Sequence, residues 1–175
     1  NYRYKHYLPL KNGLNGLGCY SRYPILSATP ILYKGTRNGS VAYRIKVGGD
    51  TLLVINNHLE SNKILKSDVE TYQEMIDAPN KKNLLAGVRK LWGKMAEATS
   101  IRAKQADVLV ETIRDSKEKA VVLCGDFNDT PISYTHHVLL DEELQDAYAE
   151  TGNGLGVSYN KDRLYVRIDH ILTSK

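Results

Sequence analysis

Cysteine and long apolar runs are scarce in this chain of 175 residues, and each scarcity excludes a class of protein. Its two cysteines, Cys19 and Cys124, are too few for a disulfide framework. Because no apolar run reaches about 18 residues, the sequence predicts no transmembrane helix. The first residues, NYRYKHYLPL, lack the apolar core of a signal peptide, and the chain does not begin with Met. The cellular compartment therefore stays open.

The remaining composition is typical of one globular domain. Apolar residues make up 42% of the chain and charged residues 25%, and a chain of this length can bury a sizeable core. Neither an internal repeat nor a low-complexity tract is present. Cys124 lies within an apolar run, which favours a small buried hydrophobe over a reactive thiol. We therefore expect a single domain over residues 1–175.

The net charge of +4 is unevenly distributed along the sequence. Residues 81–104 carry +6, so the other residues sum to −2, and we assign the basic character to this one element. A basic stripe can bind nucleic acid or an anionic membrane surface, but a solvated helix face is the favoured interpretation. The segment holds one acid, Glu97, and seven basic residues: Lys81, Lys82, Arg89, Lys90, Lys94, Arg102 and Lys104.

Residues 1–60 have the pattern of strands and turns. Apolar and polar residues alternate over 40–47, and an apolar run follows over 51–59. The turn signal Gly48-Gly49-Asp50 lies between them, so the two runs predict a hairpin. Pro24 predicts an edge strand or an irregular strand start, because proline cannot donate a ladder hydrogen bond.

Residues 61–116 have the pattern of helices. Ser67 or Asp68 can cap a first helix that ends at 78–80. Beyond that break, apolar positions recur mostly three and four residues apart, which predicts one or two helices covering about 30 residues. We place the stem of Arg102 on their apolar face and assign Trp92 and Met95 to packing. The other positions on this face are Leu84, Val88, Leu91, Ala98, Gln105 or Ala106, Leu109 and Ile113.

Residues 120–175 return to strands and loops. The run AVVLCG predicts a short buried strand, and a helix is expected to begin near Ile132. Asp129 or Thr130 would cap that helix, with Pro131 at its first position. A Gly-rich loop over 151–160 precedes a final strand over 164–172. This order of elements indicates an α/β or α+β layered fold.

Polar side chains gather where three of the predicted strands end. Because side chains alternate along a strand, the residues of each pair share a face. If the strand ends meet, one pocket holds an imidazole, two carboxylates and an amide, a set that suits a phosphate ester. The pairs are Asn56 with His58, Asp126 with Asn128, and Arg167 with Asp169.

Each of these residues taken alone favours a structural role. A histidine at a strand end is more often structural than catalytic, and an aspartate there is often a turn or cap residue. Asp126 differs, because Asn128 and Asp129 can supply the cap downstream. We therefore assign Asp126 no structural role and treat it as a functional candidate.

Four motifs, YSRYPIL, NNHLES, GDFND and RIDHIL, follow one another in the order of a known family. With them the chain resembles the endonuclease/exonuclease/phosphatase superfamily of Mg²⁺-dependent phosphoesterases. The resemblance implies two packed mixed β-sheets flanked by helices. The expected fold is therefore a mixed two-sheet sandwich, as an incomplete version of the superfamily's four-layer fold.

The resemblance also implies roles for single residues. His58 would hydrogen-bond the scissile phosphate, and Asp126 would position or deprotonate the attacking water. Asn128 would hold that water or a phosphoryl oxygen, and either Asp126 or Asn128 could bind Mg²⁺ or Mn²⁺. Asp169 would orient a catalytic histidine. Arg22 resembles a phosphate-contacting arginine, although a structural salt bridge is an equal alternative.

The chain departs from the family pattern at both ends. The Gln-Glu motif that supplies the principal metal ligand would precede residue 1, and the Ser-Asp-His motif would follow Lys175. The neighbouring His170 is expected to be structural, so it does not replace the missing histidine. We therefore expect a domain without its first strands and its last strand. The metal site would be weak and this chain inactive alone, because two ligands are too few for Mg²⁺.

The substrate and partners remain open at this stage. Nucleic acid, a lipid headgroup and a sugar phosphate all fit the same pocket residues, and nothing indicates an oligomeric state. Export or membrane anchoring through a preceding segment is compatible with the sequence. The alternative function is a degenerate, non-catalytic binding module whose basic segment 81–104 binds nucleic acid, membrane or protein.

Overall fold

A computed structural model describes residues 1–10, 15–62, 68, 70, 81–161 and 164–175 of the chain. The helix predicted to begin at Ser67 or Asp68 falls largely outside these ranges. None of the helices in the described ranges combines the length and apolarity needed to cross a bilayer.

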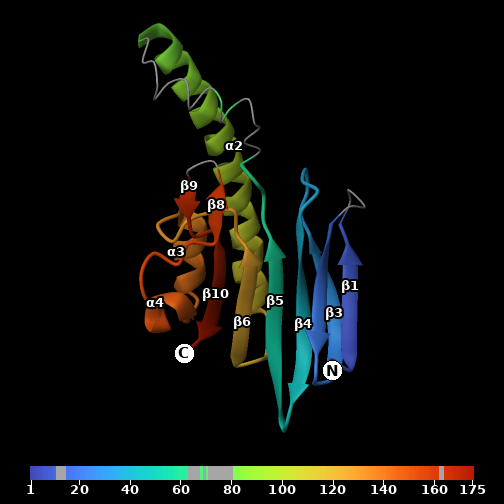
Figure 1. The fold of residues 1–175 in the computed structure, drawn as a ribbon. Helices are drawn as coiled ribbons and strands as arrows, with labels where there is room; N and C mark the ends of the chain where they lie inside the picture. The colour runs from blue at the N-terminus through green and yellow to red at the C-terminus, as the bar shows by residue number, and fades with distance from the viewer. Residues whose placement is uncertain (11–14, 63–67, 69, 71–80, 162–163) are drawn as a thin grey trace.

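A six-stranded mixed sheet forms the centre of the fold (Figure 1). Neighbouring strands run antiparallel except for one central parallel pair, β5 and β6. The predicted hairpin at Gly48-Gly49-Asp50 is confirmed as the β4–β5 connection. In spatial order the strands are β3 (Ile25–Leu32), β4 (Gly39–Val47), β5 (Asp50–His58), β6 (Ala120–Asp126), β10 (Asp169–Ser174) and β7 (Leu144–Asp146).

Strand β3 shows the irregular start that Pro24 predicts. It lies at the edge of the sheet, and its register against β4 shifts between Ile25 and Ser27. A proline at this position costs no ladder bond inside the sheet.

Helix α2 (Lys81–Arg114) lies in the crossover that joins the parallel strands β5 and β6. It is one continuous helix of 34 residues, in agreement with the predicted apolar spacing. A parallel pair needs a long crossover, and a helix packed on the sheet is its usual form. As a result, the carboxyl ends of β5 and β6 lie at the same edge of the sheet.

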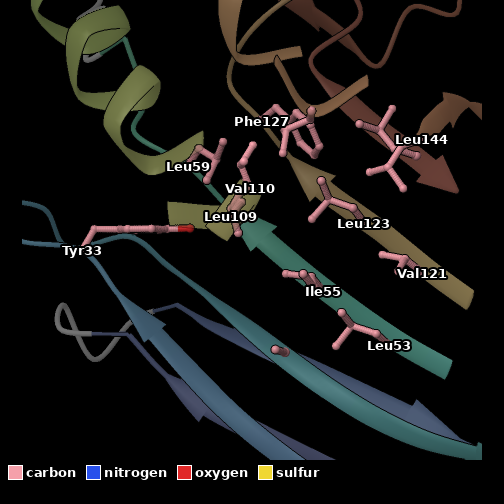
Figure 2. Packing of buried hydrophobic residues seen from close by; sticks show 13 residues of the cluster. Tyr33, Leu53, Ile55, Leu59, Leu109, Val110, Val121, Leu123, Phe127 and Leu144 are labelled. Atoms are coloured by element: carbon pink, nitrogen blue, oxygen red, sulfur yellow. The ribbon is translucent and has the colours of Figure 1, made fainter. Parts of the chain in front are cut away.

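The main hydrophobic core lies between α2 and one face of the sheet (Figure 2). Leu53 and Ile55 of β5 project to this side, as do Val121 and Leu123 of β6. The alternation along each strand thus separates a helix-covered face from an opposite face. Leu109, Val110, Leu59 and Phe127 complete the part of the core nearest the strand ends.

A second layer packs on the opposite face of the sheet. It is the two-stranded sheet of β1 (Tyr4–Pro9) and β2 (Gly16–Ser21). Its inward side chains, which include Leu8 and Leu17, pack against Val41, Tyr43 and Ile45 of β4. The structure therefore confirms a mixed α/β fold with two packed sheets and flanking helices.

Two details of the last third differ from the predictions. Helix α3 (Tyr134–Leu140) begins after Ser133, whose hydroxyl accepts the His136 amide, so neither Asp129 nor Thr130 is its cap. The predicted final strand divides into β9 (Leu164–Val166) and β10. Strand β9 pairs with β8 (Tyr159–Lys161), and helix α4 (Ala147–Thr151) follows β7.

The assignment of Trp92 and Met95 to packing is wrong. Trp92 is 69% exposed and Met95 41% exposed, whereas Ala98, Ala106 and Leu109 are buried. Spacing finds the inward face of α2, but it does not show how far along the helix the sheet extends.

Gly125 provides a test of how closely β5 and β6 approach each other beside the strand ends. Its φ is +129°, and a Cβ there would lie 2.1 Å from the Asn57 carbonyl oxygen. We expect Gly125→Ala to lower the free energy of unfolding by at least about 2 kcal/mol, because clash and backbone strain add. Urea denaturation would measure this loss. Gly49→Ala, where a Cβ meets nothing within 4 Å, is the matched control. Equal effects of the two variants would contradict the close approach.

Candidate active site

Three of the predicted site residues lie side by side across three neighbouring strands. His58 at the end of β5 pairs in register with Asp126 at the end of β6. Asp126 in turn lies opposite Asp169 at the start of β10. Register partners project to the same side of a sheet, with Cβ atoms about 5 Å apart. We call His58, Asp126 and Asp169 the polar row.

The electrostatics of the polar row suit proton transfer. The His58 Nε2 lies 3.9 Å from the Asp126 Oδ2, and the two side chains are 30% and 35% exposed. Burial raises the pKa of Asp126, and the nearby Asp169 carboxylate raises it further. The Asn128 amide, His58 and Arg102 act in the opposite direction. A partly buried carboxylate with a raised pKa beside an imidazole can accept a proton from a bound water.

Asn128 reaches the polar row by a different route from the one predicted. Strand β6 ends at Asp126, so strand alternation does not extend to Asn128. Asn128 instead adopts a left-handed conformation, with φ +50°. Its backbone N–H donates to the Asp126 Oδ1 at 2.8 Å, and its Nδ2 donates to the Leu59 carbonyl at 3.1 Å. Asp126 therefore does have a structural role, as the acceptor in this turn, in addition to any chemistry.

The side chain of Arg102 is buried beneath the loops that follow β5 and β6. It is 2% exposed, and three of its nitrogens donate to both loops and to its own helix. The Nε donates to the Asp129 Oδ2 at 2.9 Å. One terminal nitrogen donates to the Glu60 carbonyl and the Asn62 side chain, both at 2.9 Å, and the other to Thr99 at 3.0 Å.

These bonds fix the position of the two loops relative to each other. The Leu59 amide donates to the Asp126 carbonyl at 2.9 Å, and the Glu60 amide donates to the Gln105 side chain at 2.9 Å. The Asn38 side chain also donates to the Leu59 carbonyl at 2.6 Å. We call Arg102 and its partners the Arg102 network. The helical spacing predicted only that the stem of Arg102 lies on the apolar face, and it did not indicate this network.

Ser158 positions Asp169 at the other side of the row. Its hydroxyl accepts the backbone N–H groups of Ile168 and Asp169, each at 3.0 Å. Its own amide donates to the Val166 carbonyl at 3.1 Å. The Gly-rich sequence around Ser158 predicted a loop, but no sequence signal indicated that the hydroxyl would hold the start of β10.

A second cluster of titratable side chains, His136, Asp146 and His170, lies buried behind the row. Its possible ligand atoms lie within 4.8 Å of one another. The Asp146 carboxylate already accepts both terminal nitrogens of Arg167, at 3.0 and 2.7 Å, and the His136 Nε2 at 2.9 Å. A divalent ion would have to displace that guanidinium, so this group does not fit a metal site.

Arg22 lies at the opposite end of the sheet from the polar row. It follows β2 and precedes β3, where the Pro24 carbonyl accepts the Lys46 amide. Ile25 of β3 lies level with Ile45, and Ile45 lies level with Leu52, near the start of β5 rather than its end. Arg22 is exposed, with its guanidinium 5.9 Å above the Tyr2 ring. The structure does not bring Arg22 to the site.

Part of the basic charge of α2 is neutralised inside the molecule. Lys90 and Lys94 contact the buried Asp68 carboxylate, and Arg102 contacts Asp129. Arg89 and Lys104 remain exposed. The predicted basic stripe therefore offers fewer cations to a partner than its sequence suggests.

The oxygen atoms at the row fit a divalent cation in part. Mg²⁺ is usually held by one or two carboxylates together with waters and substrate phosphate. Asp126 and Asp169 provide two carboxylates on adjacent strands, and their mutual repulsion raises the pKa of Asp126. The Asn128 Oδ1 adds a neutral oxygen, since its Nδ2 is bound to Leu59.

Comparison with known proteins gives both a family match and fold matches. A family model described as "Endonuclease/Exonuclease/phosphatase family" matches residues 1–175. The search of curated sequences found no match. Three similar structures are truncated TDP2 from Caenorhabditis elegans (14% identity, TM-score 0.60), the human Nocturnin catalytic domain with bound sulfate (15%, 0.57) and TDP2 from D. rerio complexed with single-strand DNA product (14%, 0.55).

These structures are longer than the chain. The matches cover 98%, 98% and 91% of this chain but only 61%, 60% and 57% of the C. elegans, human and D. rerio chains respectively. Identities this low show a common fold and nothing finer about the site.

Replacing Arg102 tests the energetic role of its network. Because Arg102→Ala leaves the Asp129 carboxylate without its buried partner, we expect the free energy of unfolding to fall by about 3–5 kcal/mol. Urea denaturation would measure the loss. Arg114→Ala, which breaks an exposed pair with Glu142, should change stability little. A similarly small loss for Arg102→Ala would contradict the role of the network.

His170 predicts a pH dependence of stability. Burial lowers its pKa from 6.5 to about 4, so the folded chain keeps it neutral where the unfolded chain is protonated. Below about pH 6.5 the unfolded chain binds a proton at His170 that the folded chain does not, so the free energy of unfolding falls as the pH is lowered toward 4. Between pH 7 and 5 this loss is about 2 kcal/mol. In His170→Phe this slope should be smaller, whereas in a variant of the exposed His137 it should be unchanged. Equal slopes in urea denaturation at the two pH values would exclude His170 as the cause.

Proposed function

The chain belongs to the endonuclease/exonuclease/phosphatase family, and on that premise we propose that it supplies part of the active site of a divalent-metal-dependent phosphoesterase. The observation that carries the proposal is the polar row. Family membership explains the fold, whereas the row aligns an imidazole and two carboxylates across β5, β6 and β10. Hydrolysis of a phosphate ester needs groups of these kinds: an acceptor for the proton of water and a donor to the phosphoryl oxygens.

Asp126 positions the attacking water and accepts its proton. Its pKa is raised above that of an exposed aspartate and so lies closer to neutral pH, which makes the carboxylate a better proton acceptor. One carboxylate oxygen is bound to the Asn128 amide, which fixes the direction of the other oxygen. That second oxygen faces His58, so the water would bind between the two side chains.

His58 donates a hydrogen bond to a phosphoryl oxygen and stabilises the charge that develops there. Asn128 holds the water or a second phosphoryl oxygen, because its amide orientation is fixed by the Leu59 carbonyl. Asp169, whose backbone N–H donates to the Ser158 hydroxyl, orients a catalytic histidine. Hydrogen bonds thus set the direction of the Asn128 side chain and hold the backbone of Asp169.

Asp126 and Asn128, with Asp169 beside them, are the residues that would hold Mg²⁺ or Mn²⁺. A bound divalent ion supplies Lewis-acid stabilisation of phosphoryl oxygens. These three residues fill only part of the octahedral coordination shell of Mg²⁺. Water, substrate or other protein segments would have to supply the remaining ligands. We therefore propose that this chain by itself is inactive or nearly so.

The substrate is a phosphate ester, and a phosphodiester of nucleic acid is the favoured class. In the comparisons, D. rerio TDP2 is complexed with a single-strand DNA product, and human Nocturnin holds sulfate, a tetrahedral anion of phosphate-like shape. Those ligands belong to those proteins. They support the proposal that the site of this fold accepts phosphate-like groups. They also favour a phosphoesterase over the alternative function, a binding module based on the basic segment 81–104.

Turnover by the isolated chain and by a longer protein that contains it tests the proposal. We expect hydrolysis of bis-p-nitrophenyl phosphate with Mg²⁺ or Mn²⁺ by the longer protein and little or none by the chain. In the longer protein, His58→Ala and Asp126→Ala should each lower kcat at least about 10²-fold. His137→Ala and Asp141→Ala, at exposed positions, are matched controls.

The possible outcomes separate the parts of the proposal. Near-normal kcat in His58→Ala or Asp126→Ala would remove the role assigned to that residue. Clear metal-dependent turnover by the isolated chain would contradict its proposed inactivity. No hydrolysis of any phosphate ester by the longer protein would refute the phosphoesterase function itself.

A further inference from the structure

A groove of about 420 Å³ lies between the edge strands β1 and β3. Within the described residues β1 pairs only with β2, and β3 pairs only with β4, so both strands present a free edge here. Arg3, Lys5 and His6 line one side, and Ile25, Ser27 and Ala28 line the other. None of these residues belongs to the polar row or to the Arg102 network.

The charged side chains that line this groove, Arg3 and Lys5, are both positive. Residues 1–49 contain eight Lys or Arg and no Asp or Glu. The assignment of the chain's basic character to residues 81–104 alone is therefore wrong, since it overlooked this acid-free tract. Neither Arg3 nor Lys5 has a carboxylate partner in the described part of the chain, and both are exposed. Their charges are available to an anion, unlike those of Lys90, Lys94 and Arg102.

The walls of the groove combine apolar and hydrogen-bonding groups. Ile25 and Ala28 belong to the apolar cluster between the two layers, whereas Ser27 adds a hydroxyl. Ile25 and Ala28 would face opposite sides of a regular strand, and the register shift in β3 after Ile25 lets both pack on this cluster. His6 is oriented by the Tyr43 hydroxyl, 3.3 Å from its Nδ1.

We propose that this groove binds the phosphate group of a phosphorylated ligand of about nucleotide size. The guanidinium fork of Arg3 matches two phosphate oxygens, and Lys5 adds a second positive charge. The volume lies within the usual range for small-molecule pockets, about 300–1,000 Å³. The apolar wall suits a ligand whose phosphate is attached to a flat or apolar body.

The groove is distinct from the polar row. Its Ile25 lies level with Ile45 and Leu52, six residues before His58 along β5. At about 3.3 Å per residue this corresponds to about 20 Å. The inference therefore goes beyond the proposed phosphoesterase function, and a ligand in the groove would not occupy the catalytic position.

Binding to the chain itself, without metal or turnover, tests this site. We would titrate the ¹⁵N-labelled chain with AMP, adenosine and inorganic phosphate in EDTA and follow amide shifts. AMP should shift residues 3–6 and 25–28 with a dissociation constant of about 1 mM or lower. Adenosine, which lacks the phosphate, should bind at least about tenfold more weakly. Inorganic phosphate should compete with AMP.

Two variants that each remove two positive charges distinguish this groove from general electrostatic attraction. Arg3→Gln with Lys5→Gln should weaken AMP binding at least about tenfold, because the charged donors are lost. Arg89→Gln with Lys104→Gln, on exposed positions of α2, should leave it unchanged. The two pairs change the net charge equally.

Four results would overturn the proposal. They are an absence of amide shifts at the groove, shifts centred on His58 and Asp126, equal binding of adenosine and AMP, and an equal loss in the α2 control variant. Because no metal or hydrolysis is involved, failure here would leave the phosphoesterase proposal untouched, and the converse also holds.

Discussion

The buried guanidinium of Arg102 is the interaction on which the geometry of the candidate site depends. It joins the loop after β5 to the loop after β6 through Glu60, Asn62 and Asp129. A charge that is 2% exposed is tolerated only when its hydrogen bonds are satisfied, so the loops cannot move apart without exposing unpaired groups. His58 and Asp126 are the last residues before these two loops, so fixing the loops also fixes the distance between His58 and Asp126.

The parallel pairing of β5 and β6 makes such a network possible. Because the strands are parallel, both carboxyl ends lie at one edge, and the crossover helix α2 passes behind them. Arg102 lies on this helix, and its guanidinium donates hydrogen bonds to both loops. The antiparallel strand β10 then adds Asp169 by beginning at the same edge. One helix thus supports the core through Leu109 and Val110 and the site through Arg102.

The distribution of charge gives the two ends of the sheet different chemistry. The polar row presents carboxylates and an imidazole at one end, where we propose that a cation and a phosphate ester bind. At the other end, Arg3 and Lys5 of the acid-free tract 1–49 line the groove and have no carboxylate partner among the described residues. Some cations of α2, in contrast, form ion pairs with Asp68 and Asp129. Charge counted along the sequence does not separate these cases.

The sequence by itself determined the mixed α/β fold, the β4–β5 hairpin, the long helix and the candidate residues His58, Asp126 and Asp169, because alternation and helical spacing are local properties of the chain. Only the tertiary structure decided the left-handed turn at Asn128, the burial of the Arg102 guanidinium and the exposure of Trp92. It also placed Arg22 far from the row. Each of these depends on which segments meet in space, and hydrogen bonds between distant loops leave no periodic pattern in a sequence.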